Sequence, residues 1–125
     1  MNMKKAVLFA LTTLTILAIN QANAAGLYDG IWQVSESGFA TLNQNGNSVI
    51  ITELDLDEGD FSVTSGTLIN NEAVFSTIYG NVSATYRIVF NSLTTATLTV
   101  LSCIPDPTSI CNFSAGTSIL LTKVF

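Results

Sequence analysis

In Leu27-Tyr28-Asp29-Gly30-Ile31-Trp32-Gln33-Val34, side chains of different character alternate around the only tryptophan of the chain. An extended backbone places Trp32 and Val34 on one face and Asp29 and Gln33 on the other. Period-two alternation of this kind is typical of a β-strand with one buried face. We therefore interpret the stretch as the first strand of a sheet.

The residues before this stretch have the pattern of a secretory signal peptide. Lys4 and Lys5 precede an uncharged apolar run, and Ala22-Asn23-Ala24 forms a small-x-small site before the expected cleavage, which leaves a mature chain starting at Ala25. The run is shorter than the roughly 20 residues of a membrane-spanning helix. We predict a signal peptide over 1–24, one small domain over 25–125, and a secreted or periplasmic location.

The predicted mature chain is strongly acidic. It keeps Arg87 and Lys123 against nine acidic residues, 2 − 9 = −7. Such a charge disfavours nucleic acid and anionic lipid as partners, and it favours solubility or a cationic partner.

From Gly26 onward, runs of β-forming residues recur with turn residues between them. The predicted strands are 27–36, 38–45, 47–56, 60–69, 72–80, 82–91, 94–104 and 112–124. Because the connections are short, successive strands should pair as antiparallel hairpins. Asn45-Gly46 predicts a type I′ turn. We expect an all-β fold, an eight-stranded antiparallel up-and-down meander barrel, with a β-sandwich as the alternative.

Alternation predicts which side chains face the barrel interior. The inward candidates beyond the first strand are Phe61, Val63 and Ile69; Phe75 and Tyr79; and Val82, Tyr86, Ile88 and Phe90. So many large side chains in short strands favour a filled interior over a ligand cavity.

Two strands are apolar on both faces, with Ile50 and Leu54 opposite Val49 and Ile51, and Val74 and Ile78 opposite Phe75 and Tyr79. Either the outward residues form a partner or oligomer interface, or a bulge shifts the register.

The end of the chain has the alternation of an outer-membrane barrel, with Ile119 and Leu121 before a terminal Phe125. Lys123 interrupts that face, and the strands barely reach the roughly nine to eleven residues of a spanning strand. We expect no membrane span in the mature chain.

Cys103 and Cys111 are the only cysteines. In an exported chain, such a pair predicts one disulfide. Closing this short loop is expected to contribute roughly 2.5 kcal/mol.

Gly30-Ile31-Trp32 in the first strand of a meander barrel resembles the Gly-x-Trp of the calycin group, which includes lipocalins and avidins. The resemblance implies that Trp32 plugs one end of the barrel and that a basic residue packs across it, with Lys123 where lipocalins usually have Arg. A single tryptophan does not supply the several that avidins use around biotin, so biotin binding is not implied. The candidates for the barrel plug or a ligand pocket are Tyr28, Trp32, Phe75, Tyr79, Tyr86 and Lys123.

Residues for catalysis are scarce. The chain has no histidine, its cysteines are expected to be bonded, and no glycine-rich phosphate loop is present. We predict no enzyme activity and no cofactor. The acidic run from Glu53 to Asp60 offers oxygen ligands for calcium, but its spacing departs from the EF-hand loop; the alternative is an exposed hairpin tip that discourages aggregation.

Three functions remain open. The first is a non-catalytic secreted barrel that binds a protein, with self-association as one form, or acts as a structural module at the cell surface or in the periplasm. The second is a lipocalin-like carrier of a small apolar ligand, and the third is a secreted hydrolase inhibitor that uses the loop from Ile104 to Ile110.

Overall fold

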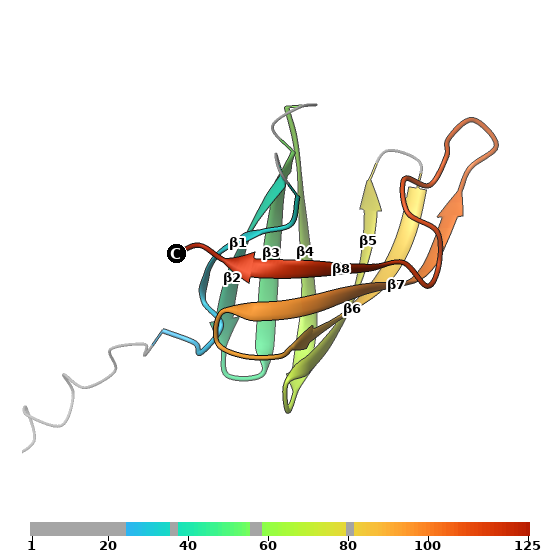
Figure 1. Ribbon diagram of the computed structural model, residues 1–125. Helices are drawn as coiled ribbons and strands as arrows, with labels where there is room; N and C mark the ends of the chain where they lie inside the picture. Colours follow the sequence, from blue (N-terminus) through green and yellow to red (C-terminus); the bar gives the residue numbers. More distant parts are fainter. Residues whose placement is uncertain (1–24, 36–37, 56–58, 80–81) are drawn as a thin grey trace, which may run out of the picture.

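The protein is a closed barrel of eight antiparallel strands in the order β1 to β8 (Figure 1). The computed structural model describes residues 25–35, 38–55, 59–79 and 82–125, and no residue in these ranges is helical. The strands are β1 (Gly30–Gln33), β2 (Gly38–Asn45), β3 (Ser48–Asp55), β4 (Asp60–Ile69), β5 (Glu72–Tyr79), β6 (Val82–Phe90), β7 (Thr95–Pro105) and β8 (Ser118–Lys123). The predicted meander barrel is confirmed and the sandwich alternative is wrong. The predicted signal peptide, 1–24, lies outside the described residues.

Two strands, β1 and β8, begin more than one residue later than predicted. Before β1 the chain makes a turn in which the Asp29 amide donates to the Gly26 carbonyl, 3.1 Å away. The Asp29 carboxylate accepts hydrogen bonds from two backbone amides, that of Gly26 in the same turn and that of Gln44 on β2. Before β8, Thr117 donates to the Ser114 carbonyl in another turn, so the strand starts at Ser118.

The hairpin after β2 is tight, as predicted, but its turn type differs. Asn45 pairs with Ser48, which makes Gly46 and Asn47 the central residues. Among the described non-glycine residues only Asn70 has a positive φ, while Gly46 has φ of 59°. The second central residue, Asn47, therefore has a negative φ. A positive φ at the first central position and a negative φ at the second correspond to a type II′ turn, which favours glycine at the first position.

The barrel closes where β1 meets β8. Trp32 pairs with Lys123, and Gln33 with Thr122. The pairing continues past β8, since the Ile31 amide donates to the Phe125 carbonyl at 2.9 Å and the Val124 amide donates to the Ile31 carbonyl at 2.8 Å. This closure leaves no free sheet edge at β1 or β8 over the paired residues.

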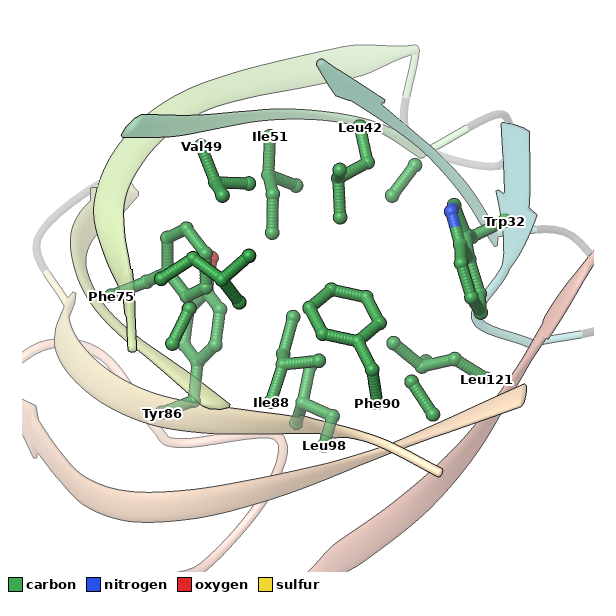
Figure 2. Packing of buried hydrophobic residues seen from close by; sticks show 14 of the residues in the cluster. Trp32, Leu42, Val49, Ile51, Phe75, Tyr86, Ile88, Phe90, Leu98 and Leu121 are labelled. Carbon is green, nitrogen blue, oxygen red and sulfur yellow. The ribbon is translucent and has the colours of Figure 1, made fainter. Parts of the chain in front are cut away.

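Apolar side chains fill the barrel (Figure 2). The cluster joins Trp32 of β1, Leu42 of β2, Phe75 of β5 and Phe90 of β6 with other buried residues. The inward prediction is confirmed for Phe75 and for Val82, Tyr86, Ile88 and Phe90. The side chains of Ile78 and Tyr79 lie outside the described ones.

The prediction for β4 is wrong by one residue. Phe61, Val63 and Ile69 are exposed, whereas Thr64 and Leu68 are buried. The Thr64 hydroxyl can lie inside because it donates to the Ser76 carbonyl at 2.9 Å. Gly66 also lies opposite Phe75, and a methyl group there would come within 2.8 Å of the Phe75 ring. A threonine and a glycine therefore occupy the inner face where the large Phe75 ring needs room.

β7 continues past its pairing with β8, which covers Thr95–Thr99, and the loop before β8 lies at one side of the barrel (Figure 1). The Cys103–Cys111 disulfide, with Cα atoms 6.2 Å apart, ties this loop back to β7. A bulge in β7 shifts its register against β6 between Thr85 and Tyr86. The register of β3 is continuous on both sides, so Ile50 and Leu54 point outward for a reason other than a bulge.

Candidate functional site

Trp32 belongs to a group of three aromatic residues with Tyr28 and Phe90, and it lies at one side of the barrel interior (Figure 2). Its side chain is 2 % exposed and its indole N–H donates to the Tyr28 carbonyl at 3.0 Å. Phe90 meets the indole edge-on at 5.6 Å between ring centroids, and Tyr28 stacks on Phe90 at 3.8 Å. Edge-on and stacked pairs of this kind stabilise packing, and the one polar atom of the indole is satisfied by backbone. The role of Trp32 as a barrel plug stays a prediction.

Lys123 lies next to Trp32, which is its register partner across β1 and β8. The Lys123 side chain passes over Gly30, where an added methyl group would lie 2.5 Å from Cε and would overlap the Phe125 carbonyl oxygen. Gly30 also has φ of 145°, a conformation that side chains rarely adopt. The glycine of Gly30-Ile31-Trp32 thus makes room for the C-terminal strand. A cation–π contact of Lys123 with the indole stays a prediction.

The other aromatic candidates form a second group on the opposite side of the interior (Figure 2). The rings of Phe75 and Tyr86 stack at 5.7 Å with an angle of 21° between their planes. The side chain of the third candidate here, Tyr79, lies outside the described ones. The sequence-predicted residues therefore divide into two groups, separated by aliphatic side chains such as Leu42, Ile51 and Ile88.

Between the two groups lies a cavity of about 20 Å³, lined mainly by apolar side chains that include Trp32, Leu42, Ile51 and Leu121. A water molecule needs at least about 10–15 Å³ of such space, so the cavity accommodates about one. Sites for drug-sized ligands have volumes of about 300–1,000 Å³. This cavity is therefore too small for such a ligand.

The acidic hairpin between β3 and β4 is described in part. Glu53 reaches the rim of the cavity, and its carboxylate accepts a hydrogen bond from the Ser62 hydroxyl at 3.4 Å. Asp55 is the register partner of Asp60, and 56–58 lie outside the described residues. Over the described part of the chain, no three His, Cys, Asp or Glu side chains are grouped so that they could hold a metal ion. The calcium hypothesis for Glu53 to Asp60 stays a prediction.

One carboxyl group in the disulfide-tied loop has a perturbed pKa. The Thr108 amide and hydroxyl both donate to the Asp106 carboxylate at 2.9 Å. These hydrogen bonds, the backbone one foremost, hold the pKa of Asp106 below its usual value. The arrangement is a local turn stabilised by an aspartate, which gives the loop its shape.

The outer surface of the barrel carries a group of exposed apolar side chains, of which the sequence analysis predicted only some to point outward. Large apolar side chains cover the outside of β3 and β4: Ile50 and Leu54, each 45 % exposed, Phe61 at 69 % and Val63 at 59 %. We call these four residues the β3–β4 outer face. Leu54 is the register partner of Phe61, and Thr52 is that of Val63, so the four lie on one face of adjacent strands. Alternation identified Ile50 and Leu54 as outward but assigned Phe61 and Val63 to the interior.

No protein-family model, curated protein or solved structure matches this chain. Over the described ranges, no helix has the length and apolar character needed to cross a bilayer. The fold is consistent with the calycin architecture, because it is a closed eight-stranded antiparallel up-and-down barrel with Trp32 packed inside its first strand.

Proposed function

We propose that this protein is a non-catalytic exported barrel that binds another protein through the β3–β4 outer face. The observation that carries the proposal is the exposure of Ile50, Leu54, Phe61 and Val63 on two adjacent strands. Contiguous apolar patches are rare on monomeric soluble proteins and mark interaction sites when they occur. Aromatic side chains such as Phe61 are enriched at interface cores.

The scarcity of residue types used in catalysis supports a binding role. The chain has no histidine, and its two cysteines form the Cys103–Cys111 disulfide. Arg87, one of the two basic residues after position 24, lies 3.9 Å from Glu72 in an ion pair. The predicted signal peptide supports action outside the cytoplasm, in the periplasm or at the cell surface.

The experiment that tests this proposal is quantitative capture with matched variants. The purified protein, Phe61→Ser/Val63→Ser, and Leu101→Ser/Ile104→Ser are each immobilised and exposed to periplasmic and secreted fractions of the source cells. Leu101 and Ile104 are also exposed apolar residues, but they lie on β7. The proposal predicts a partner that the parent and the β7 variant retain and the β4 variant loses. Equal retention by all three proteins, or by none, contradicts it.

A lipocalin-like carrier is the second candidate, and the apolar cavity beside Trp32 is the observation that favours it. A carrier requires the interior to expand around its ligand, because about one water fills the present space. Titration with fatty acids and small aromatics, followed by Trp32 fluorescence, tests it. A saturable change in emission supports the carrier, and constant emission across the panel rejects it.

An inhibitor role has one supporting observation as well. Ile104 and Ile110 are both exposed, and the disulfide holds the loop between them. A panel of serine and cysteine proteases and glycosidases, assayed with the protein in excess, tests this role; unchanged rates throughout reject it.

A further inference from the structure

We propose that the partner binds as an extended segment that pairs antiparallel with β4 at Val63, on the side of β4 that faces β5. The inference rests on the proposed function, because it names the backbone form and the sequence pattern of a partner at the same residues. It follows from the register between β4 and β5, which is shorter than either strand.

β4 and β5 pair over only part of their lengths. Their register covers Gly66–Ile69 of β4 and Glu72–Phe75 of β5. Away from this hairpin the two strands separate (Figure 1). The register of β4 with β3 is longer and includes Val63, which lies opposite Thr52. Among the described residues of β5, Val63 has no register partner. β4 therefore has a neighbouring strand on only one side at Val63.

The N–H and C=O groups of Val63 point to the β5 side of β4. The Leu68 amide donates to the Asn47 carbonyl, on the β3 side, at 2.7 Å. Successive residues of a strand direct these groups to opposite sides, and the register with β3 has no shift. Val63 stands an odd number of positions before Leu68, so its groups point away from β3. Thr67, which has the same parity, pairs with Val74 of β5.

A side-chain hydrogen bond joins the two strands next to this position. The Thr64 hydroxyl donates to the Ser76 carbonyl of β5 at 2.9 Å. The bond occupies a β5 carbonyl without extending the register. An incoming strand would therefore pair from Val63 toward the start of β4.

This side of β4 lacks the features that usually protect an exposed strand edge. Proteins protect such edges with charged side chains, proline or β-bulges. From position 61 to 69 the sequence contains no charged residue and no proline. The register with β3 contains no bulge, and Val63 is exposed. An accessible edge of this kind is a template for a further strand, and addition of a strand is a recurrent mode of peptide recognition.

The geometry of an antiparallel pair specifies the pattern of the partner. Two residues that exchange both hydrogen bonds lie directly opposite each other, with their side chains on the same face. The residue opposite Val63 would therefore point outward, where an apolar side chain extends the β3–β4 outer face. Its two neighbours would point inward beside Ser62 and Thr64, where small polar side chains fit. The partner segment should alternate apolar and small polar residues.

A second folded copy of this chain does not meet these requirements. β5 borders the edge and pairs with β4 from Gly66 onward, so the incoming segment has to be a single strand. In the closed barrel each strand has a neighbour on both sides, so a folded copy has no single strand to supply. An extended segment of another protein does.

Amide hydrogen exchange tests whether the edge is free. In the protein alone, the Val63 amide should exchange about tenfold or more faster than the Thr64 amide, whose N–H points toward β3. Equal protection of the two amides overturns the inference, because the Val63 N–H would then have a partner within the barrel.

The binding test uses two synthetic peptides that differ only in their backbone donors. The first is ETVTVTVK, and the second carries a methyl group on the backbone nitrogen of each valine. Each is labelled with fluorescein and titrated with the disulfide-bonded protein while its anisotropy is measured. Val63→Pro removes the N–H at the edge, and the matched control Val63→Ala keeps it. Proline is tolerated at strand edges where the N–H is not used by the sheet. Unchanged Trp32 emission verifies that each variant is folded.

The inference predicts that the first peptide binds the parent about tenfold or more tightly than the methylated one. Val63→Pro should weaken its binding by a similar factor, and Val63→Ala should weaken it less. If Val63→Pro does not fold, the comparison of the two peptides on the parent decides.

Two results separate this inference from the proposed function. If both peptides bind the parent equally and Phe61→Ser/Val63→Ser weakens both, strand pairing is wrong although the outer face still binds protein. If neither peptide binds, or if light scattering shows a dimer that Val63→Pro abolishes, the inference is overturned. The capture experiment with Phe61→Ser/Val63→Ser then decides the proposed function by itself.

Discussion

Trp32 is a buried residue whose packing is directly described. The indole is packed against Phe90, and its N–H is satisfied by the Tyr28 carbonyl. A lone tryptophan in a small barrel also suggests a binding pocket, and that interpretation depends on the space beside the ring. Because the cavity beside the ring has room for about one water, we expect a plug rather than a ligand pocket.

Trp32→Ala should lower the free energy of unfolding by about 3–5 kcal/mol, because it removes a large buried side chain and leaves a cavity. Urea denaturation followed by far-UV circular dichroism measures the change. Leu120→Ala, at an exposed position of β8, is the control and should change stability little. A Trp32→Ala variant as stable as the parent contradicts the plug.

Gly30→Ala should destabilise the protein by about 1–3 kcal/mol more than Gly46→Ala. Both glycines have a positive φ, so both substitutions strain the backbone. A methyl group at Gly46 meets nothing within 4 Å, whereas at Gly30 it meets Phe125 and Lys123. The difference between their thermal unfolding midpoints therefore measures the close approach of the C-terminal residues to β1. Equal unfolding midpoints for the two variants would contradict a steric role of Gly30 in the packing of Lys123 and Phe125.

At the scale of the elements, the sequence predicts strand number, order and most boundaries, because turn residues separate the runs of β-formers. The sequence does not predict which face of β4 is buried. One face carries Phe61 and Val63 and the other carries Thr64 and Gly66, so the pattern alone favours burial of the aromatic face. The constraints that decide it come from the neighbouring strand β5. The Thr64 hydroxyl donates a hydrogen bond to the Ser76 carbonyl, and the lack of a side chain at Gly66 leaves room for the Phe75 ring. No pattern within β4 contains that information.

This failure concealed half of the candidate site. Ile50 and Leu54 were identifiable because β3 is apolar on both faces. Phe61 and Val63 were not, since the face of a strand is assigned as a whole and a shift of one residue reverses it. The two aromatic groups in the interior were predictable residue by residue, but their separation across the barrel needed the register of all eight strands.

Reduction of the Cys103–Cys111 disulfide should cost roughly 2.5 kcal/mol through the entropy of the freed loop. The bond lies in the extension of β7 and its loop, away from the closure of β1 on β8. We therefore expect Cys103→Ser/Cys111→Ser to lower the unfolding midpoint while the far-UV spectrum stays that of a β-barrel. A loss of β-structure at room temperature would show that the loop is required for barrel formation.

The whole molecule combines a closed, filled interior with an apolar region on its outside. Buried side chains from most strands converge on one core, so stability comes from within the barrel. The Ile50, Leu54, Phe61 and Val63 side chains add nothing to that core, since they point away from it. Substitutions there should leave stability nearly unchanged and alter binding, which separates the function of the outer face from the fold.

Site-specific photo-crosslinking in the source cells tests this claim most directly. A photoreactive amino acid replaces Val63 in one strain and Ile104 in another, two exposed apolar residues on different strands. The account predicts a discrete crosslinked product of this protein with a different protein from position 63 and none from position 104. No product from position 63, or the same product from both positions, would contradict it.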